Sequence, residues 1–147
     1  MNENKPASIH IFVEQEMSST PQELLAVMLD HVNLSRFFNA EFSVIKAENT
    51  AEAFGGKGCI RQVSSGKQIF KEEITAASDN GFSYQIIGSG PVTEHRGDVV
   101  FISKGPTTEV QYNIKFNGPK WVPDFLVKFI VTRDMKQALK KLANFFR

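Results

Sequence analysis

Turn-forming residues interrupt the chain at short, regular intervals between Phe42 and Phe116, and this spacing limits the available folds more than any other feature of the sequence. Apolar and polar residues alternate between the interruptions, which is the pattern of half-buried strands. Strands separated by turns about every 8 to 12 residues are typical of an antiparallel meander. The turn clusters are Gly55-Gly56, Ser65-Gly66, Asp79-Asn80-Gly81, Gly88-Ser89-Gly90-Pro91 and Lys104-Gly105-Pro106. The predicted strands lie near residues 42–48, 57–64, 68–77, 82–88, 95–103 and 107–116.

A further strand and two short helices are expected before the meander. Ile9, Ile11 and Val13 alternate with more polar neighbours, which predicts a first strand. The segment Thr20-Pro21-Gln22-Glu23 is a capping box with proline at the first helical position, so we expect a helix over about residues 21–29. The helical spacing of Leu34, Phe37 and Phe38 indicates a second short helix soon after.

After the meander, the sequence predicts one long amphipathic helix. Pro123 suits the start of a helix, and the apolar residues that follow recur at steps of three or four, which places them on one face. This stripe consists of Phe125, Phe129, Thr132, Met135, Leu139, Leu142 and Phe146. We expect five of these residues to close the core and to form the floor of an internal cavity: Phe125, Phe129, Met135, Leu139 and Leu142.

Composition excludes several classes of protein. The 17 basic and 16 acidic side chains lack the basic excess of a nucleic-acid binder. The single Cys59 and three scattered histidines supply no local metal motif, and no nucleotide or nucleophile motif is present, so we expect neither metal nor cofactor. The start of the chain lacks a signal pattern and no apolar run approaches a membrane span. We therefore predict a cytoplasmic protein without stable membrane insertion.

Length and charge distribution add expectations about organisation and partners. With 147 residues, the chain is expected to form one domain over 1–147, with a polar tail at about residues 1–7. We expect a monomer or a dimer. From residue 121 onward, six basic side chains accompany two acidic ones. Such a helix usually presents a solvated face, and a weak contact with an acidic partner or a membrane surface is the alternative.

Several local segments follow one another in a recognisable order. They are Thr20-Pro21-Gln22-Glu23, Leu34 with Phe37, Gly58-Cys59-Ile60-Arg61-Gln62-Val63, Phe70-Lys71-Glu72-Glu73-Ile74 and Tyr84-Gln85-Ile86-Ile87-Gly88, ahead of the terminal helix. In this order and spacing, the chain resembles the START-related, pollen-allergen-like superfamily (SRPBCC), and within it the bacterial polyketide cyclase/dehydrase and lipid-transport branch.

The resemblance implies an α+β helix-grip fold over nearly the whole chain. A curved antiparallel sheet of six to seven strands would wrap around the long C-terminal helix, with two short helices after the first strand and an apolar cavity inside. The superfamily contains carriers, receptors, cyclases and hydrolases, so the fold alone leaves the activity open.

Alternation along the strands predicts which side chains point into the cavity. A turn centred near Ser65-Gly66 places Arg61 opposite Phe70 and Cys59 opposite Glu72, so Arg61 and Glu72 become diagonal neighbours on the inner face. This arrangement predicts a structural ion pair, an Arg61 whose stem packs while its charged head reaches water, or a polar anchor for a ligand carbonyl or hydroxyl.

The following hairpins add further inward-facing side chains. A three-residue turn ending at Gly81 pairs Ile74 near Ile86 and puts Phe82 and Tyr84 on the inner face. The same alternation adds His95 and Tyr112 to this face. His95 is either a solvated residue at the rim or a general base, and the two candidates for catalysis are Glu72 and His95.

The leading hypothesis is a cofactor-free protein that binds or transports a hydrophobic small molecule, such as a lipid, polyketide-like or isoprenoid compound. The candidate ligand-binding residues are Arg61, Phe70, Glu72, Ile74, Phe82, Tyr84, Ile86, His95, Phe101, Tyr112, Ile114, Phe125 and Phe129. One alternative is a cyclase or dehydratase in which Glu72 or His95 moves a proton while Arg61 or Tyr112 stabilises an enolate. Another is a protein-interaction module that docks through the basic helix.

Overall fold

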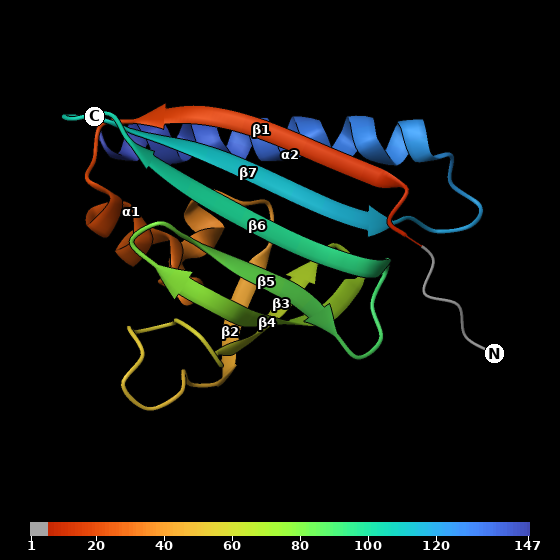
Figure 1. The fold of residues 1–147 in the computed structure, drawn as a ribbon. Coiled ribbons are helices and arrows are strands. Elements are labelled where there is room, and N and C mark those ends of the chain that lie inside the picture. Colours follow the sequence, from red (N-terminus) through yellow and green to blue (C-terminus); the bar gives the residue numbers. More distant parts are fainter. Residues whose placement is uncertain (1–5) are drawn as a thin grey trace.

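The computed structural model describes residues 6–147 and contains one seven-stranded antiparallel sheet that runs alongside a long helix (Figure 1). The strands are β1 (Ile9–Met17), β2 (Glu41–Lys46), β3 (Ile60–Ser65), β4 (Gln68–Ser78), β5 (Gly81–Ile87), β6 (Thr93–Ser103) and β7 (Thr108–Asn117). The helices are α1 (Pro21–Met28), the 3₁₀ helix η1 (His31–Arg36) and α2 (Asp124–Phe145). The strand order is β1-β7-β6-β5-β4-β3-β2. Strands β2 to β7 therefore each lie beside the next strand in the sequence, and β1 pairs with β7. The predicted α+β helix-grip architecture is thereby confirmed. The first five residues of the expected N-terminal tail lie outside the described part of the chain.

The two short helices form where the sequence predicts them. Thr20 caps α1, because its hydroxyl accepts from the Glu23 amide at 3.1 Å and the Glu23 carboxylate accepts from the Thr20 amide at 2.9 Å. Leu24, Leu25 and Met28 then bury the inner face of α1. The second helix, η1, is a 3₁₀ helix and ends at Arg36, before Phe37 and Phe38. These helices lie together at one end of the sheet (Figure 1).

The hairpin between β3 and β4 has the predicted faces and a different register. Arg61 lies directly opposite Glu72, whereas Phe70 pairs with Val63, so the expected diagonal arrangement is corrected. The turn is formed by Gly66, with a φ of +61°, and the residue after it, one position later than expected. A one-residue displacement of a turn centre moves every pair by two residues, which preserves the alternation of faces.

The hairpin between β4 and β5 also differs in register. Ile74 pairs with Tyr84 and not with Ile86, which pairs with Glu72. The turn contains two residues because Gly81 already pairs with Ser78, and a β-bulge beyond it shifts the register again. Phe82 and Tyr84 are both buried on the inner face, as the alternation predicts.

Helix α2 covers the inner face of the sheet, and its second half closes the core. Met135, Leu139 and Leu142 belong to the buried apolar cluster. By contrast, Phe125 and Phe129 are 77% and 63% exposed, so the prediction that they form the floor of the cavity is wrong. No helix within residues 6–147 is both long and apolar enough to cross a bilayer.

Candidate functional site

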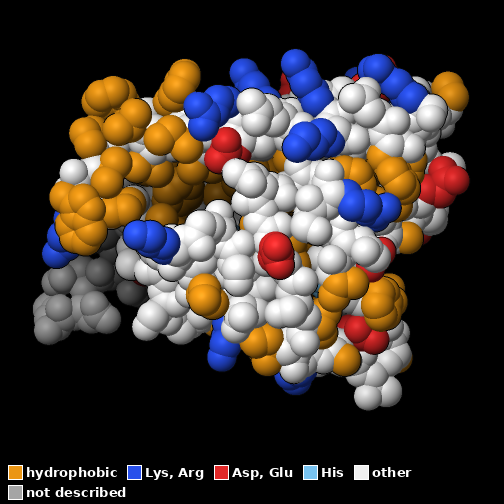
Figure 2. Space-filling model, turned by 180° about the vertical axis from the view of Figure 1, so that it is seen from behind, with side chains coloured by type: hydrophobic (Ala, Val, Ile, Leu, Met, Phe, Trp, Pro, Cys, Tyr) orange, Lys and Arg blue, Asp and Glu red, His pale blue; other side chains and the backbone are white. Residues whose placement is uncertain are grey.

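An internal cavity of about 300 Å³ opens between the sheet and the first half of α2. Figure 2 shows a hollow walled by apolar side chains on this side of the molecule. Ligand pockets in proteins have volumes of roughly 300 to 1,000 Å³ and mostly apolar walls, so this cavity is of a size that admits a small ligand. It is lined by Met28, Leu34, Phe38, Asn39, Ala40, Phe42, Arg61, Val63, Ser65, Phe70, Glu72, Phe82, Tyr84, Ile86, Pro91, Val92, His95, Tyr112, Ile114, Phe116, Val127, Val131, Asp134 and Met135.

The structure brings most of the candidate ligand-binding residues to this wall. Those that line the cavity are Arg61, Phe70, Glu72, Phe82, Tyr84, Ile86, His95, Tyr112 and Ile114. Ile74 and Phe101 are buried in the core without lining the cavity, and Phe125 and Phe129 lie on the outside. On α2 the cavity is instead lined by Val127, Val131, Asp134 and Met135, so Met135 alone of the predicted floor residues takes part.

An ion pair spans β3 and β4 at the cavity wall. Nε and Nη2 of Arg61 donate to Oε1 of Glu72 at 2.9 and 2.7 Å. The residues are only 4% and 6% exposed, because the direct cross-strand pair points both side chains inward. The Arg61 guanidinium also lies over the rings of Phe42 and Tyr84, about 5 Å from each centroid. Burial makes the pairing obligatory, since an isolated buried charge is strongly unfavourable.

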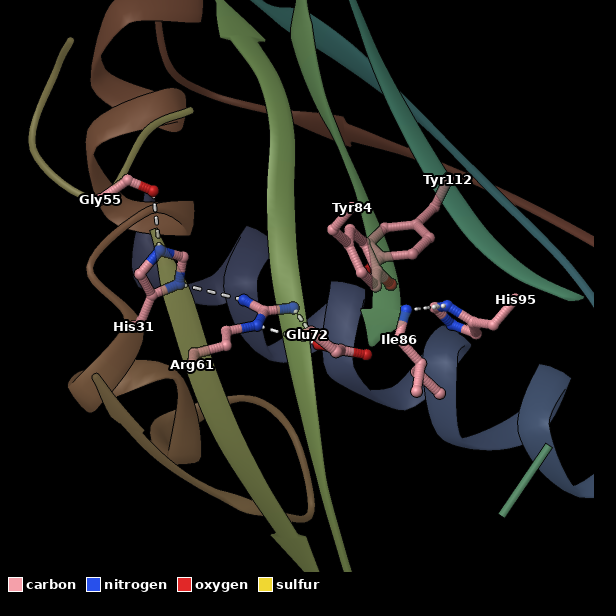
Figure 3. A network of polar contacts seen from close by, with 8 residues as sticks. All are labelled: His31, Gly55, Arg61, Glu72, Tyr84, Ile86, His95 and Tyr112. Carbon is pink, nitrogen blue, oxygen red and sulfur yellow. Dashed lines mark hydrogen bonds and ion pairs between the residues drawn. The ribbon is translucent and has the colours of Figure 1, made fainter. Parts of the chain in front are cut away.

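His31 contacts this pair from η1, a role that was not predicted from the sequence. Nη1 of Arg61 donates to Nδ1 of His31 at 3.0 Å, and Nε2 of His31 therefore carries the hydrogen that it donates to the Gly55 carbonyl at 2.8 Å (Figure 3). The bond that Nδ1 accepts requires a neutral imidazole, because both nitrogens of a charged ring are donors. Burial and the positive charge of Arg61 lower the pKa of His31 to about 4. No local motif signals this contact, because it joins segments that are 30 residues apart.

Gly55 allows the loop to reach His31. Its φ is +74°, and a β-carbon at this position would lie 2.2 Å from the Leu29 carbonyl oxygen. A side chain there would force the loop away from the helical end of the sheet, so the glycine keeps its carbonyl within reach of the imidazole.

Two tyrosines stand beside the ion pair. The hydroxyls of Tyr84 and Tyr112 hydrogen-bond to each other, from β5 and β7. Tyr84 lies flat against β6 because Gly97 has no side chain, and a β-carbon there would lie 2.4 Å from the ring. Burial, with the neighbouring hydroxyl, raises the pKa of Tyr84, and burial raises the pKa of Tyr112 to about 12. Both phenols are therefore protonated at neutral pH, and because one hydroxyl donates to the other, one hydrogen of the pair remains to donate elsewhere.

His95 faces the same region from β6. Its Nδ1 accepts from the backbone amide of Ile86 at 3.3 Å, so in the neutral ring the hydrogen is on Nε2 (Figure 3). Burial lowers the pKa of His95, although the nearby Glu72 carboxylate opposes this change. A neutral imidazole in this tautomer donates through Nε2, so the structure favours His95 as a hydrogen-bond donor over the general-base role.

Together, Arg61, Glu72, Tyr84, His95 and Tyr112 form a polar cluster on one side of a mostly apolar cavity. Arg61 and Glu72 balance each other in charge, and the other members are neutral at pH 7. Within residues 6–147, no group of three or more His, Cys, Asp or Glu side chains is arranged to hold a metal ion. The cluster is suited to orienting a polar group of a bound molecule and to moving a proton.

Comparison with known proteins supports the architecture. Residues 8–146 match a family model described as "Polyketide cyclase / dehydrase and lipid transport". No curated protein matches the chain significantly.

Solved structures of low sequence identity share the fold along almost their whole length. A START superfamily protein from Mycobacterium smegmatis is 11% identical with a TM-score of 0.79, and the alignment covers 93% of this chain and 96% of that one. The protein TTHA0849 from Thermus thermophilus is 19% identical with a TM-score of 0.69, covering 92% and 95%. Ara h 8.0201 is 14% identical with a TM-score of 0.65, covering 94% and 97%. At these identities, the likeness establishes the fold.

Proposed function

This chain belongs to the polyketide cyclase/dehydrase and lipid transport family, and we propose that it binds a hydrophobic small molecule in the cavity between the sheet and α2. The observation that carries this proposal is the cavity itself, whose wall is mostly apolar and holds the polar cluster, with Asn39, Ser65 and Asp134 as its other polar residues. Transfer of apolar ligand surface from water contributes about 25 cal/mol per Å². A lipid, a polyketide-like compound or an isoprenoid provides such a surface.

The polar cluster restricts the chemistry of the ligand's polar end. Both hydrogen bonds that Glu72 accepts from Arg61 end on Oε1, so Oε2 is left as an acceptor. In Figure 3 the second carboxylate oxygen points away from Arg61. His95 Nε2 offers a donor close by. Since the positive charge of Arg61 is already balanced, a ligand carboxylate would add an unbalanced buried charge. We infer that the ligand carries a neutral hydroxyl or carbonyl group.

A fluorescence titration tests the binding site. An apolar dye should enter the cavity and be displaced by a long-chain alcohol more effectively than by the fatty acid of the same length. Val131→Trp should fill the cavity and weaken dye binding by about tenfold or more, because the added ring occupies the volume of the ligand.

Phe129→Trp is the matched control, because it introduces the same side chain two residues away on the outer face of α2. Its affinity should stay within about twofold of the wild type, since no contact in the cavity changes. Equal affinities for the wild type and Val131→Trp would place the dye elsewhere and remove the support for the cavity as the ligand site.

One observation favours an enzymatic function as a second candidate. Oε2 of Glu72 is a carboxylate oxygen in a largely apolar cavity, beside hydroxyl and imidazole donors, and such a group is suited to accept a proton from carbon or oxygen. A cyclase or dehydratase acting on a polyketide-like substrate would use Glu72 as the base and the free hydroxyl hydrogen of the tyrosine pair to stabilise an enolate.

The variant Glu72→Gln separates the two candidates, because the amide oxygen still accepts from Arg61 but transfers no proton. For a carrier, ligand affinity should stay within about tenfold, because one polar anchor contributes on the order of 1 kcal/mol. For an enzyme, turnover should fall by about 10² to 10⁴ while binding persists. If the wild type forms product and the variant does not, the protein is an enzyme and the carrier assignment is wrong.

A further inference from the structure

Five large apolar side chains are exposed beside the cavity, and neither the core nor the ligand site accounts for them. They form the apolar patch, which consists of Trp121, Phe125, Leu126, Phe129 and Ile130. Trp121, at 85%, is the most exposed of them. Figure 2 shows apolar side chains gathered at one end of the molecule, next to the hollow. Contiguous exposed patches of this kind mark interaction surfaces more often than isolated apolar residues do.

The patch arises because the first half of α2 is apolar on nearly every side. Val127 and Val131 already cover the cavity, yet the residues from Phe125 to Thr132 include a single charge, Lys128. An ordinary amphipathic helix needs only one apolar stripe. The extra apolar side chains therefore face outward.

A basic row continues the same outer face of α2 beyond the patch. Arg133 and Lys140 follow Leu126 at intervals of seven residues, or about two turns, and therefore share its side of the helix. Lys136 lies seven residues after Phe129 and extends the row. Arg133 has one acidic neighbour, Asp134, at 3.5 Å, and both side chains are about half exposed, so this contact neutralises little of the row.

The patch also borders the opening through which a ligand must pass. Val127 and Val131 line the cavity and alternate along α2 with Leu126 and Ile130 of the patch. Figure 2 shows the hollow directly beside the apolar side chains, with Lys and Arg side chains along the neighbouring edge. A surface that covered the patch would therefore also cover the mouth of the cavity.

We propose that the apolar patch and the basic row dock this chain on a bilayer surface rich in anionic phospholipid, with the mouth of the cavity against the lipid. Aromatic and aliphatic side chains next to Lys and Arg are the composition of helices that lie in the plane of a membrane interface. Basic side chains near an anionic leaflet add to the attraction. This proposal goes beyond ligand binding, because it assigns the surface where an apolar ligand enters without crossing water.

The charge of the row distinguishes a bilayer from a second copy of the chain. In a twofold dimer, the same surface of both copies meets itself. Dimerisation through this face would bring Arg133, Lys136 and Lys140 of each copy into one interface, where like charges repel. An anionic lipid surface instead complements them.

Vesicle binding tests the proposal with the full chain. Trp121 is the single tryptophan, so its fluorescence reports on the patch directly. Its emission should shift to shorter wavelength with vesicles of phosphatidylcholine mixed with phosphatidylglycerol, and much less with phosphatidylcholine alone. Flotation of the same mixtures measures the partition coefficient.

Two sets of substitutions measure separately what the apolar patch and the basic row contribute to vesicle binding. Phe125→Ser with Phe129→Ser should lower partitioning to the anionic vesicles by about tenfold or more, because apolar area no longer enters the interface. Arg133→Gln, Lys136→Gln and Lys140→Gln together should lower it by about tenfold or more and abolish the lipid preference. Phe54→Ser is the matched control, because Phe54 is 71% exposed and lies outside the patch. Its partitioning should stay within about twofold of the wild type.

Dye binding in the absence of vesicles should be unchanged in all these variants, which separates failure of docking from failure of the ligand site. The absence of vesicle binding, equal binding to neutral and anionic vesicles, or equal loss in Phe54→Ser would overturn the proposal. A concentration-dependent dimer in sedimentation that shields Trp121 would overturn it in favour of a second copy.

Discussion

The two halves of α2 have similar helical spacing and opposite environments. In the second half, Met135, Leu139 and Leu142 are buried in the core, whereas in the first half Phe125 and Phe129 are exposed. The second half packs against other buried side chains, and the first half borders a cavity and its opening. An apolar stripe on a helix therefore indicates which residues can be buried, while the neighbouring elements decide which are. Where the stripe extends beyond the packed core, it remains available for a ligand or a surface.

The largest expected effect comes from placing a charge in each half. Leu142→Asp buries a carboxylate with no partner in the core, which should cost several kcal/mol, comparable to the roughly 5 to 15 kcal/mol total stability of an ordinary domain. Ile130→Asp places the same charge in the first half, which is partly exposed, and should cost less than about 1 kcal/mol. Urea unfolding measures both. Similar losses in the two variants would show that the halves are equally packed.

The next effect concerns the ion pair across the cavity from the first half of α2. Arg61→Met should reduce the free energy of unfolding by about 3 to 5 kcal/mol, because Glu72 is left buried without its partner. Replacing both residues, Arg61→Met with Glu72→Leu, should recover much of this loss. A single variant as stable as the wild type would mean that water reaches Glu72 through the cavity more freely than its 6% exposure indicates.

A smaller effect is the pH dependence of stability that the buried His31 contributes beside this ion pair. Its folded pKa of about 4 lies below the ordinary value of 6.5, so the fold favours the neutral ring. The stabilisation is complete above pH 6.5 and is lost as the pH falls toward 4, by an amount on the order of 3 kcal/mol. Thermal unfolding of the wild type and His31→Gln over this range measures it. A parallel decline in both proteins would assign the pH dependence to other groups.

The smallest expected effect is truncation of a phenylalanine in the first half. Phe129→Ala should change the stability by no more than about 0.5 kcal/mol, because the ring is already in water. Leu139→Ala in the second half should cost about 2 to 5 kcal/mol through the cavity that it leaves. Chemical denaturation measures the loss in the free energy of unfolding of each variant. A loss of more than about 2 kcal/mol for Phe129→Ala would place its ring in the core.

Local pattern accounts for the elements and for the inward direction of most side chains. The capping box at Thr20 and the turn residues of the meander act within a few positions, so their effects are visible in the sequence. Alternation places Arg61 and Glu72 on the inner face even though the predicted register was wrong by two residues, because such a shift preserves the face. The superfamily resemblance, which rests on the order of these elements, is confirmed by the family match over residues 8–146.

Tertiary structure decided the parts that depend on distant segments. The bond between His31 and Arg61 joins η1 to β3, and Gly97 is needed only because Tyr84 of the neighbouring strand lies against it. Likewise, Val127 lines the cavity while Phe125 does not, although both are apolar. Short-range propensity and periodicity determined by themselves what each segment forms and which side chains share a face. Only the packing of segments against one another decided which apolar faces were covered, because burial is a property of the neighbours and not of the residue.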